Sequence, residues 1–174
     1  MKPDFCVRKP AFLVWTFRKV RGSMDEKAVK ICWCLPAAER DIRLPGYATP
    51  GAAGMDVEAA VIGELPIAPG EIVVVPTGFR VALPPGYEMQ VRPRSGLAVK
   101  HGLTVVNSPG TIDADYRGEV KIALINLGRK TYIISRGDRI AQLVLAPVSK
   151  VTLHVVESLD KTERDAGGFG HTGR

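Results

Sequence analysis

The sequence has few cysteines and histidines and no long apolar run. Its three cysteines are an odd number, and Cys32 and Cys34 would share one face of a strand, where a disulfide is geometrically unfavourable. A reducing compartment, the cytoplasm, is therefore expected. His101, His154 and His171 are scattered and lack the spacing of a zinc site. Nowhere do about eighteen apolar residues follow one another, so we expect no membrane-spanning helix.

Outside the N-terminal segment an excess of positive or negative charge is also absent, because basic and acidic residues nearly balance. The net charge is +6, but residues 1–23 hold six basic residues and one acid, which accounts for +5. The other 151 residues carry 18 basic and 17 acidic residues, a net of +1, so nucleic-acid binding is not expected. Residues 1–23 contain an apolar run without a cleavage pattern after it. We place them outside the fold; organellar targeting and a mis-start upstream of Met24 stay open.

Long helical patterns are absent as well. Glycine (18 residues) and proline (13 residues) recur between short runs rich in Val, Ile and Leu, which is typical of an all-β barrel, sandwich or jelly roll. We expect no helix of ten or more residues, and one helical turn near residues 95–100. Strands are expected at residues 29–35, 71–75, 78–83, 87–91, 102–108, 120–126, 131–134 and 151–157, and at the ends of 52–59 and 136–145.

Residues 110–119 combine four charged side chains with a tyrosine and two glycines. In an extended chain Asp113 and Asp115 would face the same side. Two close carboxylates disfavour joint ionisation unless a cation offsets them. Arg117 could compensate one carboxylate, which leaves the other free to act as a base or to approach a metal. The alternative is a polar hairpin tip.

A second polar segment, residues 92–98, has two arginines, a serine and a glycine in a turn that opens a helical turn. Exposed backbone N–H groups and arginines suit phosphate oxygens, so an anion site is favoured over a solvated turn. Asp56 follows small residues that permit close backbone approach, and either faces a ligand or caps a turn. Gln142 interrupts an apolar strand, either as an amide with a specific partner or as a core glutamine bonded to backbone.

The C-terminal residues 164–174 are rich in glycine around one aromatic, Phe169. Such a segment cannot pack a core, so terminal disorder is one interpretation. The other is a mobile lid in which Phe169 stacks on a planar ligand, with Arg164 and Thr172 available for phosphate.

Taken together, five segments resemble, in order, the five motifs of trimeric dUTP pyrophosphatases (dUTPases). They are residues 53–59, 93–98, 110–119, 136–145 and 164–173. The resemblance implies a distorted jelly-roll β-barrel formed by residues 24–160. It also implies a homotrimer with interfacial active sites, and a flexible C-terminal arm, residues 161–174, that closes over the active site. Residues 1–23 lie outside the resemblance.

The implied activity is hydrolysis of dUTP to dUMP and pyrophosphate, which lowers dUTP and supplies dUMP for thymidylate synthesis. By position, Asp113 matches the carboxylate that activates the attacking water. Asp56 matches an aspartate that reaches Mg²⁺ through water, with the metal held mainly by the phosphates. Tyr116 matches the ring that packs under the deoxyribose and excludes a 2′-hydroxyl.

The resemblance also assigns the remaining contacts of the substrate. Uracil is read by Asn107, Gly110, Thr111 and Ile112, and Lys121 matches a position that touches the nucleoside. Phosphate contacts match Arg94, Ser95, Gly96 and Gln142. The arm residues are Arg164, Phe169, Gly170, His171 and Thr172, and the family commonly has serine where His171 stands.

Three alternatives remain. A dCTP deaminase of the same fold would need a catalytic glutamate and a second serine-arginine pattern after Arg94, where this chain has Gly96, Leu97 and Ala98. A bifunctional deaminase and pyrophosphatase fails for the same reason. A non-catalytic nucleotide-binding module would be favoured by a degenerate catalytic segment, but Asp113 is present.

Overall fold

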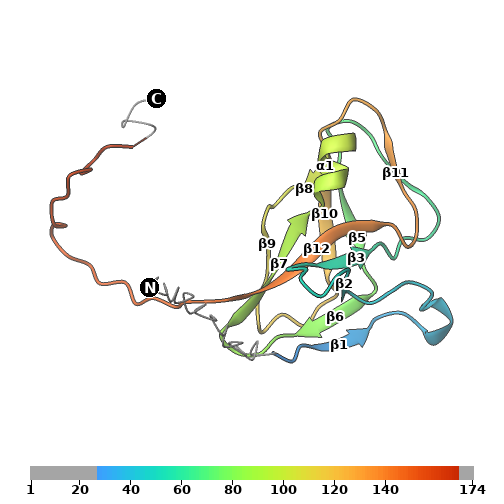
Figure 1. Ribbon diagram of the computed structural model, residues 1–174, viewed down its shortest axis with the longest axis horizontal. Helices are drawn as coiled ribbons and strands as arrows, with labels where there is room; N and C mark the ends of the chain where they lie inside the picture. The colour runs from blue at the N-terminus through green and yellow to red at the C-terminus, as the bar shows by residue number, and fades with distance from the viewer. Residues whose placement is uncertain (1–26, 169–174) are drawn as a thin grey trace, which may run out of the picture.

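A computed structural model describes residues 27–168, and these residues are mostly β-strand (Figure 1). The strands are β1 Lys30–Trp33, β2 Gly46–Tyr47, β3 Met55–Glu58, β4 Leu65–Ile67, β5 Ile72–Pro76, β6 Phe79–Ala82, β7 Tyr87–Pro93, β8 Leu103–Val105, β9 Gly110–Ile112, β10 Lys121–Asn126, β11 Tyr132–Ile134 and β12 Arg139–Pro147. One short α-helix, α1 Ser95–His101, and a 3₁₀ turn, η1 Ala37–Glu39, complete the elements. The predicted all-β class is confirmed, and α1 lies where a helical turn was expected.

All strand pairs are antiparallel, and the largest sheet has the order β2-β3-β12-β7-β9. A second sheet has the order β5-β10-β8, and two ribbons pair β1 with β6 and β4 with β11. Strand β7 lies between β12 and β9. It therefore lies between two of the segments that carry predicted site residues, 110–119 and 136–145.

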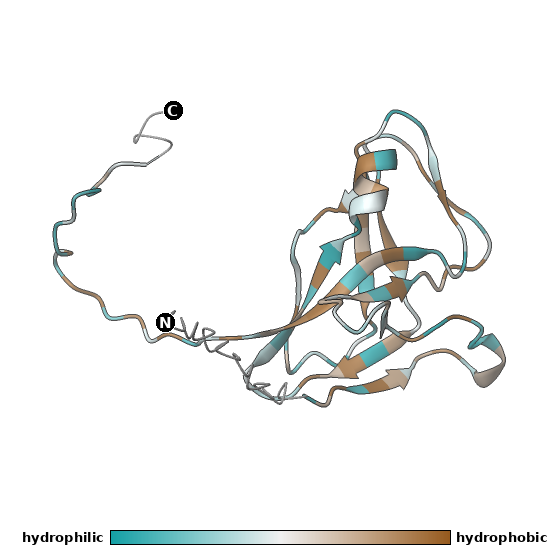
Figure 2. Ribbon diagram, in the orientation of Figure 1, coloured by the Kyte–Doolittle hydropathy of each residue, from teal (hydrophilic) through white to brown (hydrophobic). Residues whose placement is uncertain are grey.

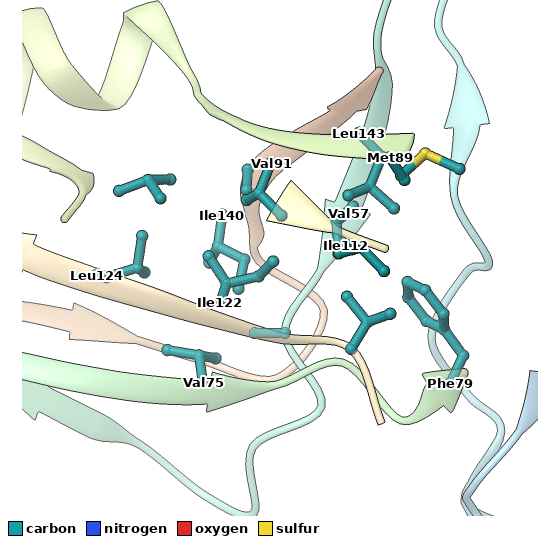
Figure 3. Packing of buried hydrophobic residues seen from close by; sticks show 14 of the residues in the cluster. Val57, Val75, Phe79, Met89, Val91, Ile112, Ile122, Leu124, Ile140 and Leu143 are labelled. Carbon is teal, nitrogen blue, oxygen red and sulfur yellow. The ribbon is translucent and has the colours of Figure 1, made fainter. Parts of the chain in front are cut away.

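Side chains from both sheets form one buried core (Figure 3). On β7 the alternate residues Met89 and Val91 are buried, and on β12 Ala141 and Leu143 are buried, with Ile140 buried in addition at the bulge between Arg139 and Ala141. This period of two is the pattern of a strand with one face on a core. Phe79 of β6 is almost completely buried at the same core. The polar residues of β12 therefore face away from the core, where they are available to a site.

The segment after β12 differs from the prediction. Residues 151–157 were expected to form a strand, but they have no regular structure, and Val151, Leu153 and Val155 are 80%, 87% and 101% exposed. Figure 1 shows the segment running away from the body, and Figure 2 shows hydrophobic and hydrophilic residues mixed along it. The expectation is wrong for this single chain because no described strand lies beside the segment to accept its backbone hydrogen bonds.

The sequence also missed three short strands, β2, β4 and β9. Proline or glycine stands in each of them, and both residue types weaken the sequence signal of a strand. No helix in the described part of the chain is long and apolar enough to cross a membrane.

Candidate active site

A hollow of about 210 Å³, which we call the β9 hollow, lies beside β9 and the turn after it. Its lining residues are Thr111, Ile112, Asp113, Tyr116, Glu119, Val120 and Lys121. Five of them were predicted as site residues from the sequence; Glu119 and Val120 were not. Because Ile112 is buried in the core while Thr111 is exposed, the strand presents its backbone edge and a polar side chain to the hollow.

Tyr116 is held in place by its neighbours in the turn. Its hydroxyl donates a hydrogen bond to the carbonyl oxygen of Glu119 at 2.9 Å. A Cβ on Gly118 would meet this hydroxyl and would lie 2.6 Å from the ring carbon Cζ. A side chain at position 118 would therefore displace the ring. Tyr116, which is 44% exposed, lines the hollow.

The two aspartates of this segment do not lie along an extended strand. Strand β9 ends at Ile112, and the backbone N–H of Tyr116 donates to the carbonyl of Asp113 at 3.2 Å, which closes a turn. The expectation that Asp113 and Asp115 share one side of an extended chain is therefore wrong. Arg117 compensates neither carboxylate, because its Nη1 donates to the carbonyls of Ala114 and Tyr116 at 2.7 and 2.8 Å.

The turn gives Asp113 and Asp115 different surroundings. Asp113 lines the β9 hollow and also a neighbouring hollow of about 640 Å³, whereas Asp115 lines only the larger one. Neither side chain accepts a hydrogen bond from the described residues. Asp113 therefore stands at the boundary of the two hollows with both carboxylate oxygens available to a ligand or a water molecule.

Asn107 lies next to the start of β9. A Cβ on Gly110 would come within 3.1 Å of the Asn107 amide nitrogen and within 3.1 Å of Val91 Cβ on β7. Glycine at position 110 thus lets β9 pack closely on β7 and on Asn107. This places the predicted Asn107 and Gly110 together at the start of β9, but neither residue lines the β9 hollow.

A second group, which we call the Asp56 cluster, consists of Asp56, Arg94, Arg139 and Gln142. Asp56 Oδ2 accepts a hydrogen bond from Arg139 Nη1 at 2.9 Å, and Asp56 Oδ1 accepts one from Gln142 Nε2 at 3.2 Å. Arg94 Nε lies 3.4 Å from Asp56 Oδ1. The Asp56 side chain is only 14% exposed, so one carboxylate holds two guanidinium groups at the edge of the core.

This cluster decides between the roles that the sequence left open. Gln142 donates to a side chain, not to backbone, and Asp56 binds side chains instead of capping a turn. Gly54 explains the small residues before β3, because a Cβ there would lie 3.2 Å from Gln142 Cβ. The close approach that the small residues were expected to permit is therefore present: the Gln142 side chain packs directly on the backbone at Gly54.

Arg94 joins the cluster to α1. It is the residue before the helix, and its Nη1 donates to the carbonyl of Arg139 at 2.8 Å. Ser95 and Gly96 form the exposed first turn of α1. The predicted phosphate contacts Arg94, Ser95 and Gly96 therefore lie together at the start of α1. Contacts with Asp56 and Arg139 hold Arg94 in place.

The β9 hollow and the Asp56 cluster are separate within one chain. Thr111 is the register partner of Gln90 on β7, and Arg94 lies four positions farther along, about 13 Å at the rise of a strand. Within residues 27–168 no hydrogen bond or ion pair joins the two groups. One protomer therefore brings the predicted residues together in two groups, not in one.

The described part of the C-terminal arm, residues 161–168, joins neither group. Arg164 is exposed, and its Nε donates to the carbonyl of Gly167 at 2.9 Å. The predicted Phe169, Gly170, His171 and Thr172 lie outside the described residues, as do Cys6 and residues 1–23. The described Cys32 and Cys34 are free, and burial, followed by the nearby Glu119 carboxylate, raises the pKa of the Cys34 thiol.

The donor set around Asp56 suits an outer-sphere contact with Mg²⁺. No group of three or more His, Cys, Asp or Glu side chains that could hold a metal occurs among the described residues. Each Asp56 oxygen accepts one hydrogen bond and keeps a lone pair for a water molecule. Mg²⁺ retains several waters in proteins and binds mainly through substrate phosphates, so these residues fit the expected metal.

Sequence reasoning missed Arg139 and Glu119. Arg139 stands in a segment already singled out, but the bulge between Arg139 and Ala141 shifts its register, so alternation could not place it beside Asp56. Glu119 Oε1 accepts the backbone N–H of Gly78 at 2.9 Å, and its Oε2 lies 3.7 Å from Lys121 Nζ. The available sequence signal for Glu119 was its position two residues before the basic Lys121, which had already been singled out.

The chain is similar to known proteins over most of its length. Residues 40–173 match the family model described as dUTPase. A deoxyuridine 5′-triphosphate nucleotidohydrolase of Desulfotalea psychrophila is 62% identical over 148 residues, which is 85% of this chain and 99% of that protein. One of the same name from Syntrophotalea carbinolica is 60% identical over 130 residues, 75% of this chain and 88% of that protein.

Solved structures give the same family. The Staphylococcus bacteriophage 80alpha dUTPase with dUpNHpp superposes with a TM-score of 0.75 at 26% identity, covering 84% of this chain and 99% of that chain. A mutant dUTPase from phage phi11 of S. aureus, described as coordinating a structural Mg(II) ion, gives a TM-score of 0.66 at 25% identity, covering 75% of this chain and 97% of that chain.

Proposed function

The chain belongs to the dUTPase family, and from that premise we propose that it hydrolyses dUTP to dUMP and pyrophosphate. The observation that carries the proposal is the β9 hollow, in which Asp113 and Tyr116 line one space with the backbone edge of β9. The reaction would lower dUTP and supply dUMP for thymidylate synthesis. The dUpNHpp complex of the bacteriophage relative supports a deoxyuridine nucleotide as the ligand.

In the proposed reaction Asp113 is the general base. Its carboxylate is exposed at the β9 hollow and carries no internal hydrogen bond, so it can orient a water molecule and accept its proton as the water attacks the α-phosphorus. Tyr116 packs under the deoxyribose. Because its ring is fixed by Gly118 and by the bond to Glu119, a ribose 2′-hydroxyl has no room to displace it.

Uracil is proposed to bind the backbone of Gly110, Thr111 and Ile112, with Asn107 and Lys121 at its edges. An exposed strand edge offers an alternating donor and acceptor pattern that can distinguish uracil from cytosine. The arm residues Arg164, Phe169, Gly170, His171 and Thr172 are proposed to close over the bound nucleotide and to exclude bulk water.

The phosphates are proposed to bind Arg94, Ser95, Gly96 and Gln142. Arg94 offers charge-assisted hydrogen bonds, which stabilise phosphoryl oxygens more strongly than neutral donors do. Asp56 would hold Mg²⁺ through a water molecule, and the metal would neutralise part of the triphosphate charge. The Asp56 cluster also holds Arg94 in position before substrate arrives.

We further propose a homotrimer whose active sites combine groups from different subunits. The separation of the β9 hollow from the Asp56 cluster supports this, because one chain does not bring catalytic and phosphate-binding residues together. The exposed alternate apolar residues of the segment after β12 also support a contact with a neighbouring subunit. In this organisation residues 24–160 form the barrel, residues 161–174 the arm, and residues 1–23 an extension of a cytoplasmic protein.

The proposed activity is tested by Mg²⁺-dependent release of pyrophosphate from dUTP, with dCTP, dTTP and UTP in parallel. Rapid turnover of dUTP alone is expected. Ammonia release from dCTP would instead indicate a deaminase, and binding without turnover would indicate a nucleotide-binding module. Light scattering measures the subunit number, and a stable monomer that turns over dUTP would contradict the interfacial site.

A further inference from the structure

A separate hollow of about 530 Å³ lies at the far end of α1 from Arg94. Its lining residues are Lys100, His101 and Gly102 from the end of the helix, Gly128, Arg129, Lys130 and Thr131 from the loop between β10 and β11, and Tyr132 from the start of β11. A seven-residue helix spans about 10 Å. The α1 hollow, as we call it, is therefore distinct from both the Asp56 cluster and the β9 hollow.

The cations of the α1 hollow have no partners within the described part of the chain. The side chains of Lys100, Arg129 and Lys130 make no hydrogen bond or ion pair with any of residues 27–168, and no acidic side chain lines the hollow. By contrast, Arg136 pairs with Asp41 and Arg139 pairs with Asp56. Like charges gathered without a counterion repel one another and create a positive potential in the hollow.

Backbone contacts hold the two cationic segments together. The N–H of Leu127 donates to the carbonyl of Gly102 at 2.9 Å. A Cβ on Gly102 would lie 2.5 Å from the backbone nitrogen of Gly128, and one on Gly128 would meet the carbonyl oxygen of His101. Both positions therefore need glycine, and the end of α1 touches the loop backbone to backbone.

A buried side chain fixes the loop itself. Asn126 is fully buried; its Oδ1 accepts the N–H of Gly128 at 2.9 Å, and its Nδ2 donates to the carbonyls of Ile67 and Lys130, each at 2.8 Å. The Cα atoms of Lys100, Arg129 and Lys130 are consequently held in place before any ligand binds. Such preorganisation lowers the ordering cost of binding.

One wall of the α1 hollow is aromatic. The rings of His101 and Tyr132 have centroids 4.9 Å apart and planes tilted by 58°. Tyr132 is half-buried and His101 is exposed. An aromatic wall beside unpaired cations is the combination that binds the base and the phosphates of nucleotides.

We propose that the α1 hollow binds an oligophosphate anion, free or carried by a nucleotide, at a site additional to the active site. Lys100, Arg129 and Lys130 bind the phosphate oxygens, and His101 with Tyr132 contacts the base when one is present. Stabilisation of the α1 dipole accounts for cations at the end of the helix, but it does not account for Arg129 and Lys130, which come from another segment.

The test uses inorganic tripolyphosphate and the full ¹⁵N-labelled chain, with the backbone amide shifts of Gly102 and Gly128 as the readout. Saturable shifts of both amides are expected. The variant Arg129→Ala/Lys130→Ala should weaken this binding at least about tenfold. The matched control Lys30→Ala/Arg80→Ala removes one lysine and one arginine from exposed positions on β1 and β6 and should leave the affinity unchanged.

Because the readout is local to the α1 hollow, its result does not depend on the proposed hydrolysis of dUTP. Thymidine triphosphate in a second titration distinguishes the ligand sources, since tighter binding than tripolyphosphate supports base contact with the ring pair. Thermal unfolding of each variant checks the fold, and Arg129→Gln provides a milder substitution. Absent shifts in the wild type, or equal weakening in variant and control, would overturn the proposal.

Discussion

Gln142 donates a hydrogen bond from its side-chain amide to Asp56 across the ladder that joins β12 to β3, at 3.2 Å between residues 86 positions apart. Arg139 and Arg94 hold the same carboxylate from two other directions. The position of Asp56 is thus set by three side chains from two segments, β12 and the residue before α1. If Asp56 reaches Mg²⁺ through water, its charge and its position should both affect the metal dependence of the reaction.

Asp56→Asn should raise the Mg²⁺ concentration needed for half-maximal turnover, because a neutral amide attracts the hydrated cation less and leaves two guanidinium groups near it. A shift of about tenfold is expected, measured by titrating Mg²⁺ at saturating dUTP. Glu58→Gln is the matched control on the same strand. It removes a carboxylate that contacts Arg43, and equal shifts in both variants would contradict the assignment of Asp56.

Asp113→Asn should lower kcat for dUTP by about 10²- to 10⁴-fold, the usual cost of removing a general base. Affinity for a non-hydrolysable dUTP analogue should change little, since the amide keeps the shape of the side chain. Asp115→Asn is the control, because Asp115 stands in the same turn but does not line the β9 hollow. Similar losses in both variants would remove Asp113 from the role of base.

Gly118→Ala should reduce discrimination between dUTP and UTP. The new Cβ would lie 2.6 Å from Tyr116 Cζ, so the ring must move. The ratio of kcat/KM for dUTP to that for UTP should fall at least about tenfold. Gly51→Ala is the control, because no atom lies within 4 Å of the added Cβ, and it should leave the ratio unchanged. If the ratio were unchanged in Gly118→Ala as well, Tyr116 would not select the sugar.

Asn126→Ala should destabilise the fold by about 2–4 kcal/mol, because it removes the partner of the buried Ile67 carbonyl and of the partly buried Gly128 N–H and Lys130 carbonyl. Chemical denaturation measures the free energy of unfolding. Thr131→Ala, an exposed residue in the following loop, should change it by less than about 0.5 kcal/mol. If the free energy of unfolding of Asn126→Ala also fell by less than about 0.5 kcal/mol, a water molecule would be replacing the hydrogen bonds of the amide.

The ion pair between Arg136 and Asp41 should make the free energy of unfolding depend on pH under acidic conditions. The Arg136 hydrogen bonds, which come from Nε and Nη2, lower the pKa of Asp41 below its ordinary value of 3.8. The unfolded state therefore binds more protons between the two pKa values. The contribution of the pair is present above pH 3.8 and is lost as the pH falls through the lower, folded pKa.

Asp41→Asn should accordingly flatten the loss of stability on acidification, measured by denaturation at several pH values below about 5. Glu64→Gln is the control, since the Glu64 side chain is exposed and pairs with no described residue. An acid dependence that stays the same in Asp41→Asn would show that the pair does not contribute. The exposure of Asp41 keeps the expected effect small.

The sequence predicted much of this site because the chemistry requires particular residue types close together in the chain. Thr111, Asp113 and Tyr116 occur within six positions, and the β9 hollow contains all three. The expectation that Asp113 and Asp115 face the same side of an extended chain was wrong, because a period of two applies only while the chain is extended. The hydrogen bond from Tyr116 to Asp113 ends that regularity one residue after β9.

By itself the sequence determined the all-β class, through short apolar runs between glycine and proline turns, and the family, through five motifs in order. Both depend on local order along the chain. Only the tertiary structure decided that Gln142 and Arg139 bind Asp56, and that Gly102 touches Gly128. These contacts join positions far apart in sequence, whose distances depend on strand register, a bulge and the packing of the whole core.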